Sequence, residues 1–246
     1  MIYMPEVKEI IGGFLILSNR VRLGISPVIQ VKGRHNIVYD TGGPNAKQYL
    51  AKELERQKID PKKVDTLIIS HSHWDHAMNP DLFPNAKIFI GKSEYEYGKN
   101  IMKSDWATPS YINRLYDGRN KELVDSEFEI ESGVKIIGIP GHTPGTLGLE
   151  VETKKGTAVL GSDALFSAKS FLAGIPLLVF HSKQKAKESM KRMKKEGSLF
   201  YPGHDRPFTF DGKNIKFISD SVFDMQIIMP PGMDNLHYHI DTRKLK

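Results

Sequence analysis

Cysteine is absent from the sequence. Disulfide bonds and thiolate metal ligands are therefore excluded, so any metal site must be built from histidine and carboxylate side chains. A long hydrophobic run is missing as well, because the apolar stretch at residues 10–17 is interrupted by Gly12 and Gly13 and is too short to span a membrane. The sequence also lacks the layout of a signal peptide. We therefore predict a cytoplasmic protein without a membrane partner.

Low-complexity segments and linkers are also missing. The chain has 246 residues, of which 39% are hydrophobic and 26% charged, and a chain of this length and composition can bury a sizeable core. Because no shift in composition divides it, we predict one domain that spans residues 1–246.

Positive charge is concentrated in one stretch. The formal net charge is +6, and much of the excess lies at residues 183–195, which are rich in lysine. Ala186, Met190 and Met193 recur there at helical spacing, which predicts a solvated helix with one narrow buried face. No signature of a nucleic-acid-binding module accompanies these lysines, so nucleic acid is not an expected partner.

The stretch with the richest chemistry is residues 70–76, with the sequence Ser-His-Ser-His-Trp-Asp-His. It follows residues 64–69, a short β-branched apolar run that predicts a buried strand. The histidines are thus expected at the carboxyl edge of a sheet, where open α/β sheets place ligands. On an extended chain His71 and His73 point to the same side, and Asp75 and His76 return from the loop to a neighbouring point. These two pairs suit two adjacent metal ions.

The same order of features, an apolar strand, a turn and then one histidine or aspartate, recurs along the chain. The predicted strands at residues 37–39, 134–139, 157–160 and 199–201 are followed by Asp40, His142, Asp163 and His204, respectively. This repetition predicts alternating strands and helices that bring these side chains to one edge of the fold.

Other segments are predicted from local patterns: a strand pair at residues 7–17 and 26–31, further strands at 86–90, 127–131 and 147–151, and a helix at 45–58. Ser93 and Glu96 match a capping box, which predicts a helix that begins there and runs towards Met102. Residues 105–120 carry scattered aromatic side chains without a clear period. That stretch suits a lid over a site or a simple covering loop.

Five motifs together resemble those of the metallo-β-lactamase superfamily of metal-dependent hydrolases, over essentially the whole chain. In order, they are Tyr39-Asp40-Thr41-Gly42, His71-Ser72-His73-Trp74-Asp75-His76, Pro140-Gly141-His142, Gly161-Ser162-Asp163 and Pro202-Gly203-His204. The resemblance implies an α/β fold of the αββα type, in which two facing mixed β-sheets are flanked by helices and the site lies at one edge.

The resemblance also implies a dinuclear metal site. The ligands of the first metal would be His71, His73 and His142, those of the second would be Asp75, His76 and His204, and Asp163 would bridge the two. Asp40 matches a residue that orients the histidine-bearing loop, and Asp75 is placed to move a proton. The expected cofactors are two divalent ions, with zinc first and iron, manganese and cobalt as alternatives, because imidazole suits several metals.

Such a site predicts hydrolysis. A hydroxide bridging the two ions is a nucleophile at neutral pH, since the pKa of bound water falls to about 7. We expect a metal-dependent hydrolase that cleaves an ester-type bond of a small molecule. A lactone is the favoured substrate class. The alternatives are a thioester, because Trp74 and Asn79 resemble glyoxalase II, a phosphodiester, and a metal-binding scaffold without activity. A homodimer is left open.

The N-acyl-homoserine lactonase branch is favoured by residues 162–166 and 200–205, which resemble it. The tail around residues 230–232 offers no domain of the kind with which glyoxalase II holds glutathione. One position departs from the lactonase pattern: Phe166 stands where that branch commonly has a tyrosine. The missing hydroxyl would have to come from another donor, such as Tyr201 or Tyr111.

The four remaining histidines are expected to have structural places. His35 belongs to a turn, and His181 lies at the surface before Ser182, the expected cap of the lysine-rich helix. His237 and His239 lie at strand spacing on an exposed strand near the end of the sequence.

Overall fold

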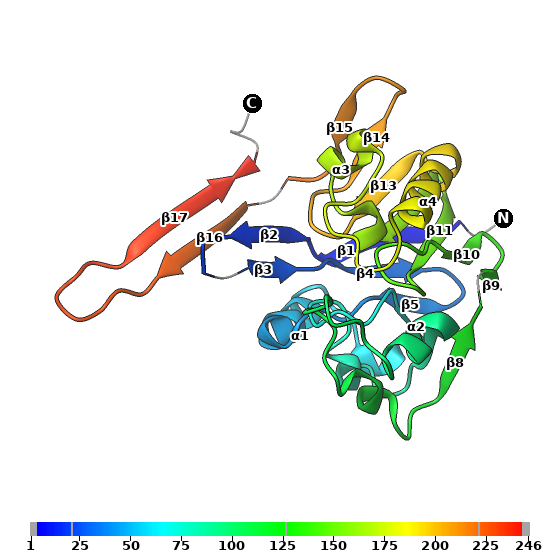
Figure 1. The fold of residues 1–246 in the computed structure, drawn as a ribbon, viewed down its shortest axis with the longest axis horizontal. Helices are drawn as coiled ribbons and strands as arrows, with labels where there is room; N and C mark the ends of the chain where they lie inside the picture. Colours follow the sequence, from blue (N-terminus) through cyan, green and yellow to red (C-terminus); the bar gives the residue numbers. More distant parts are fainter. Residues whose placement is uncertain (1–3, 21, 126, 221, 243–246) are drawn as a thin grey trace.

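Two β-sheets pack face to face in the computed structural model, which describes residues 4–20, 22–125, 127–220 and 222–242 (Figure 1). The first sheet has the order β1-β4-β5-β6-β7-β8, comprising Glu6–Ile11, Val28–Lys32, Asn36–Tyr39, Thr66–Ile69, Lys87–Gly91 and Lys121–Val124. The second has the order β15-β14-β13-β12-β11-β10-β9, comprising Ile215–Phe217, Phe208–Phe210, Leu199–Pro202, Gly156–Ser162, Leu147–Thr153, Val134–Gly138 and Glu127–Glu131. Both sheets mix parallel and antiparallel pairs.

Helices cover the outer faces of the two sheets. On one side lie α1 (Lys47–Arg56) and α2 (Lys92–Tyr97), and on the other lie α3 (Ala168–Ala173) and α4 (Lys183–Glu196) (Figure 1). Three hydrophobic clusters fill the spaces: one under α1, one between the sheets and one under α3 and α4. This layering confirms the predicted αββα sandwich.

Strand β6 shows why residues 67–69, just before the histidine-bearing loop, are all apolar. Leu67 and Ile69 point into the cluster under α1, whereas Ile68 points into the cluster between the sheets. Alternate side chains of a strand face opposite sides, so a strand covered on both faces needs a hydrophobic residue at every position. Its burial fixes the point from which the following loop starts.

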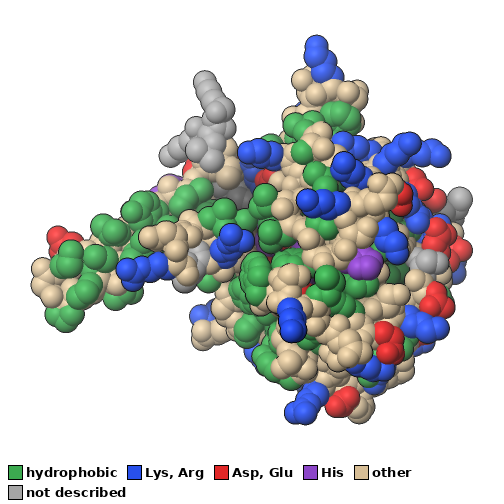
Figure 2. All heavy atoms as spheres, in the orientation of Figure 1, with side chains coloured by type: hydrophobic (Ala, Val, Ile, Leu, Met, Phe, Trp, Pro, Cys, Tyr) green, Lys and Arg blue, Asp and Glu red, His purple; other side chains and the backbone are tan. Residues whose placement is uncertain are grey.

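The segment at residues 7–17, predicted as one strand, forms two. Gly12 and Gly13 separate β1 from β2 (Phe14–Leu17), and β2 pairs with β3 (Arg22–Ile25) as a hairpin. The ring of Phe14 stacks on Phe223 of a second hairpin, β16 (Val222–Ile227) and β17 (Leu236–Asp241). The second hairpin extends away from the body of the fold and carries many exposed hydrophobic side chains (Figures 1 and 2).

The predicted capping box at Ser93 and Glu96 is wrong. Helix α2 begins at Lys92, immediately after β7, so Ser93 lies inside the helix and caps nothing. Gly91 is the capping residue, and a Cβ at Gly91 would overlap the carbonyl oxygen of Gly145. Contact with that neighbouring loop therefore sets the corner from strand to helix. The helix also ends at Tyr97, well before Met102.

The lysine-rich helix is confirmed as α4. The side chain of Ser182 accepts a hydrogen bond from the backbone N–H of Lys185, and Ala186, Met190 and Met193 form the buried face. Neither α4 nor any other helix in the described part of the chain combines the length and apolar character needed to cross a lipid bilayer.

Candidate metal centre

Loops that follow five strands meet at one edge of the sandwich. Asp40 follows β5, the stretch 70–76 follows β6, His142 follows β10, Asp163 follows β12 and His204 follows β13. All the histidines and aspartates singled out from the sequence are buried there. A buried group of charged and imidazole side chains is costly unless its members are paired or bind a cation.

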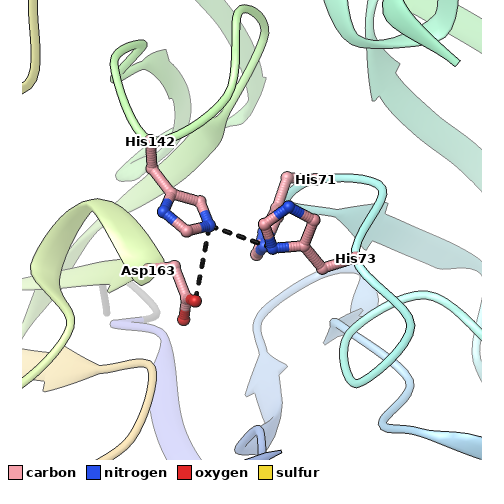
Figure 3. Close-up of side chains that lie close together, drawn as sticks. All are labelled: His71, His73, His142 and Asp163. Atoms are coloured by element: carbon pink, nitrogen blue, oxygen red, sulfur yellow. Dashed lines mark hydrogen bonds and ion pairs between the residues drawn. The ribbon is translucent and has the colours of Figure 1, made fainter. Parts of the chain in front are cut away.

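These side chains form two adjacent groups. In the first, the side chains of His71, His73, His142 and Asp163 point toward one another (Figure 3), and each offers one ligand atom within 4.8 Å of the others. The second group consists of Asp75, His76 and His204 and meets the same limit. The structure thus brings together all seven residues that we predicted as ligands. The three histidines expected at the first metal lie in one group, and the three side chains expected at the second metal lie in the other.

Asp163 lies between the two groups. Its Oδ1 atom is 3.2 Å from His76 Nε2 and 3.3 Å from His204 Nε2, both in the second group. Its Oδ2 atom is 3.4 Å from His142 Nε2, in the first group (Figure 3). One carboxylate oxygen therefore faces each group, which is the arrangement that a bridging ligand requires.

Four of the five histidines are held through Nδ1, which leaves Nε2 facing the cluster. The partners of Nδ1 are Ser70 Oγ at 2.9 Å for His71, Asp40 Oδ2 at 2.8 Å for His76, the Leu178 carbonyl at 2.8 Å for His142, and the Phe14 carbonyl at 3.3 Å for His204. Such partners fix the tautomer and orientation of metal-binding histidines.

His73 is oriented the other way. Its Nδ1 atom faces His142 Nε2 at 3.0 Å, whereas its Nε2 atom lies 3.4 Å from Asp105 Oδ1. Tyr97 and Ala107 hold Asp105 by hydrogen bonds of 2.8 Å each. Burial alone would raise the pKa of Asp105, but its contact with His73 holds that pKa below the usual range. Sequence reasoning missed this carboxylate, because it lies in the aperiodic stretch at residues 105–120.

Asp40, at the end of β5, contacts both Ser70 at the end of β6 and His76 of the second ligand group. Its carboxylate accepts hydrogen bonds from the backbone N–H and the hydroxyl of Ser70, both at 2.8 Å, and contacts His76. The hydroxyl of Ser162 also reaches Asp40 and His76. Asp40 and Ser162 both have positive φ, at 61° and 43°. Such backbone costs roughly 1–3 kcal/mol and persists only where the surroundings impose it.

Glu94 connects the two loops that carry the first group. One carboxylate oxygen accepts the backbone N–H of Ser72 at 2.8 Å, and the other accepts the Thr143 hydroxyl at 2.7 Å and the Gly145 N–H at 3.0 Å. Ser72 lies between His71 and His73, and Thr143 follows His142. Burial raises the pKa of Glu94, although these hydrogen bonds oppose the shift. No local pattern in the sequence predicted this contact.

The electrostatics of the cluster suit a bound cation. Burial lowers the pKa of His142 to about 4 despite the nearby Asp163. Burial would raise the pKa of Asp163, but His204 and His76 hold it well below its usual range. His71 Nε2, His76 Nε2 and Asp163 Oδ1 are buried and make no hydrogen bond. These orphaned atoms face the cluster, so the residues present fit divalent metal ions.

A cavity of about 230 Å³ opens above the cluster. His73, Asp75, Asp163 and His204 form part of its lining, and the other lining residues are mainly apolar: Leu15, Leu17, Trp74, Trp106, Ala107, Phe166, Leu177, Leu178 and Phe180, with Gly24 and Arg22. Of residues 105–120, only Trp106 and Ala107 reach the cavity, so most of that stretch is a covering loop.

The predicted substitute donors do not reach this cavity. Tyr201 packs between the sheets, where burial raises its pKa to about 12, and half of the surface of Tyr111 is exposed. Neither belongs to the described lining. Phe166, in contrast, is buried at the cavity wall with its ring centroid 4.6 Å from that of His204.

The other histidines lie away from the cluster. His35 faces Asp65 at 3.1 Å in a turn, and His181 is exposed next to the cap of α4. His237 and His239 lie on the exposed strand β17, as predicted, and His239 contacts Asp224 at 2.8 Å.

Comparison with known proteins agrees with this architecture. A model of the metallo-beta-lactamase superfamily matches residues 22–204. An N-acyl homoserine lactonase from a Bacillus species is 31% identical over 158 residues, which are 62% of this chain and 60% of that protein. The chain therefore spans about 60% of the length of these lactonase relatives.

Two solved structures are similar in fold. A quorum-quenching N-acyl homoserine lactone lactonase gives a TM-score of 0.66 at 23% identity, over 82% of this chain and 92% of that one. A dizinc quorum-quenching lactonase in complex with a product, N-hexanoyl-L-homoserine, gives a TM-score of 0.63 at 19% identity, over 82% of this chain and 81% of that one. At these identities the likeness concerns the fold alone.

Proposed function

The chain belongs to the metallo-β-lactamase superfamily, and on that premise we propose that it is a metal-dependent hydrolase of a small-molecule ester, with a lactone as the first substrate class. The observation that carries the proposal is the pair of buried ligand groups shared by Asp163 at the floor of an apolar cavity. The relatives named as N-acyl homoserine lactonases support the choice of a lactone.

In this proposal, His71, His73 and His142 hold one ion, Asp75, His76 and His204 hold the other, and Asp163 is shared. Two ions so held would activate a water molecule and polarise the carbonyl oxygen of the substrate. Asp75 lies at the cavity with Oδ2 3.3 Å from His204 Nε2, where it can move a proton to the leaving alkoxide. Asp40 and Asp105 orient His76 and His73.

Zinc is the proposed metal, because five of the seven candidate ligands are imidazoles, which bind zinc well. One structure of similar fold is also described as a dizinc lactonase. A cytoplasmic location, one domain over residues 1–246 and a homodimer complete the proposal. The exposed hydrophobic side chains of the β16–β17 hairpin support self-association.

The cavity favours an ester over a phosphodiester and over a scaffold role without activity. A phosphodiesterase would need several cations around the phosphate. The described cavity lining holds one, Arg22, beside Trp106, and Arg119 of the covering loop donates to the carbonyls of Pro80 and Phe83 instead. A scaffold with structural metals would enclose its ligands, since structural sites are closed. Here Asp75, Asp163 and other ligands line an open cavity.

The experiment that tests the function is a hydrolysis screen of lactones, thioesters and phosphodiesters with protein of measured metal content. We expect the highest kcat/KM for lactones or acyl esters. A preference for phosphodiesters, or the absence of hydrolysis in protein with two bound metals, would show that the proposed function is wrong.

Metal content provides the first prediction. Seven ligand side chains in two groups should hold about two divalent ions per chain, with Zn–N distances near 2.0–2.1 Å if the metal is zinc. Elemental analysis of protein purified without chelator checks this number. A value at or below one ion per chain after supplementation with zinc would contradict the dinuclear site.

The second prediction concerns Phe166, which cannot donate a hydrogen bond. A donor that acts on the reacting oxygen in a closed site contributes about 2.7–4 kcal/mol of transition-state stabilisation. Because Phe166 lies at the cavity wall beside His204, we expect Phe166→Tyr to raise kcat for lactones by up to about 100-fold, the lower end of that range, without changing metal content. Steady-state kinetics and elemental analysis check both parts. A lower kcat in the variant would mean that this position does not face the reacting carbonyl.

A further inference from the structure

The hairpin β2–β3 turns one face towards the candidate metal centre. Its strands pair Leu15 with Gly24 and Leu17 with Arg22. Residues that oppose each other across two strands, and residues two apart along one strand, lie on the same face. All four also line the cavity above the metal ligands. This face of the hairpin is therefore a wall of the substrate cavity.

Gly24 shows how closely the wall approaches the ligands. A Cβ at Gly24 would overlap Asp75 Oδ2 and would lie 2.9 Å from His204 Cε1. Only glycine lets β3 come this near without displacing a ligand. Because Arg22 lies two residues earlier on the same strand, its side chain leaves from the same face and extends along the cavity.

Arg22 is the only lysine or arginine among the described residues that line the cavity. Its guanidinium carbon lies 5.9 Å from the ring centroid of Trp106, and no carboxylate in the described ranges pairs with it. Aromatic rings connect this point to the ligands, because Phe180 lies 6.0 Å from Trp106 and 5.0 Å from His73 between ring centroids. An apolar wall thus runs from the metal centre to an unpaired cation.

This arrangement rests on the proposed ester hydrolysis and refines its substrate. We propose that Arg22 selects esters or lactones whose acyl chain ends in a carboxylate. Leu15, Leu17 and Phe180 would contact the methylene groups, and the planar guanidinium would bind the terminal carboxylate, whose single charge it matches. The chain would lie in the cavity of about 230 Å³ between the metal ligands and Arg22.

The test compares two esters with the same six-carbon acyl chain and the same leaving group. They are 4-nitrophenyl hexanoate, which is neutral, and mono-4-nitrophenyl adipate, which carries a terminal carboxylate. We expect metal-loaded protein to prefer the adipate ester about two- to fivefold in kcat/KM, as an ion pair with an exposed arginine can supply. Arg22→Gln should remove the preference and Arg22→Glu should reverse it. The change should appear in KM for the adipate ester, because Arg22 lies away from the reacting carbonyl.

Arg20→Gln is the matched control. It removes the same charge from the turn of the same hairpin, and Arg20 is not among the described residues of the cavity lining. This variant should keep the wild-type preference. Equal kcat/KM values for both esters in the wild type, or an equal loss in Arg20→Gln, would overturn the inference and leave the hydrolase function standing. If protein with two bound metals hydrolysed neither ester, the proposed function would fail and the inference with it.

Discussion

Replacing Asp163 with alanine is expected to lower the rate of ester hydrolysis by two or more orders of magnitude. Asp163 presents one carboxylate oxygen to each ligand group, at 3.2 Å from His76 and 3.4 Å from His142. Without it the two ions lose their common ligand and their fixed separation. Charge stabilisation by metal ions contributes several kcal/mol to the transition state, and each 1.36 kcal/mol changes the rate tenfold. Steady-state kinetics on a lactone and elemental analysis measure both consequences.

The matched comparison for this variant is His35→Ala. His35 is an exposed turn residue that contacts Asp65 at 3.1 Å and lies outside both ligand groups. Its replacement should leave kcat/KM and metal content near the wild-type values. Metal content in Asp163→Ala should fall from about two ions towards one. Equal effects of the two substitutions would show that the role assigned to Asp163 is wrong.

The second large effect is expected from Glu94→Ala, which should weaken metal binding by about 10- to 100-fold. Loss of residues that orient metal ligands typically has this magnitude. Glu94 accepts hydrogen bonds from Ser72, Thr143 and Gly145, and so holds the loop of His71 and His73 against the loop of His142. Alanine leaves the buried N–H of Ser72 and the part-buried N–H of Gly145 without this acceptor, while the Thr143 hydroxyl can still donate to Thr146. A buried donor left unpaired costs about 1–3 kcal/mol, so thermal stability should also fall. Competition with a chelator of known affinity gives the metal dissociation constants.

Two further variants separate the positioning role from a general loss of stability. Glu96→Ala lies two residues later on α2 and removes only an exposed contact with Lys99; it should bind metal like the wild type. Glu94→Gln keeps one acceptor oxygen, so its metal affinity should lie between those of the wild type and the alanine variant. If Glu94→Ala folds, as judged by circular dichroism, and binds metal with wild-type affinity, the loops do not depend on Glu94.

The predictions that agreed with the structure rested on periodicity. Leu67, Ile68 and Ile69 are all apolar because both faces of β6 are covered. Such an apolar run can be recognised in the sequence without knowing which segments pack against it. Since Asp40, His142, Asp163 and His204 each follow such a strand, their meeting at one edge could be expected. The motifs supplied the grouping of the seven ligand candidates, which the geometry reproduces.

The predictions that failed depended on contacts between distant segments. Ser93 and Glu96 have the spacing of a capping box, but the close approach of Gly91 to Gly145 sets the start of α2 instead. Tyr201 was one of the two donors predicted to replace the missing hydroxyl at Phe166. Its side chain points between the sheets, because it lies on a strand whose alternate residues face opposite sides.

The sequence by itself determined the fold class, the chain order of the ligand-bearing strand ends and the identity of the ligand candidates, because hydrophobic period and residue chemistry are local properties. Only the tertiary structure decided which atoms orient those ligands and what borders the cavity. Asp105 and Glu94 act through contacts with loops that lie elsewhere in the chain. Arg22 reaches the cavity because Gly24 lets β3 approach Asp75. These relations depend on distances between segments remote in sequence, and no local pattern encodes such distances.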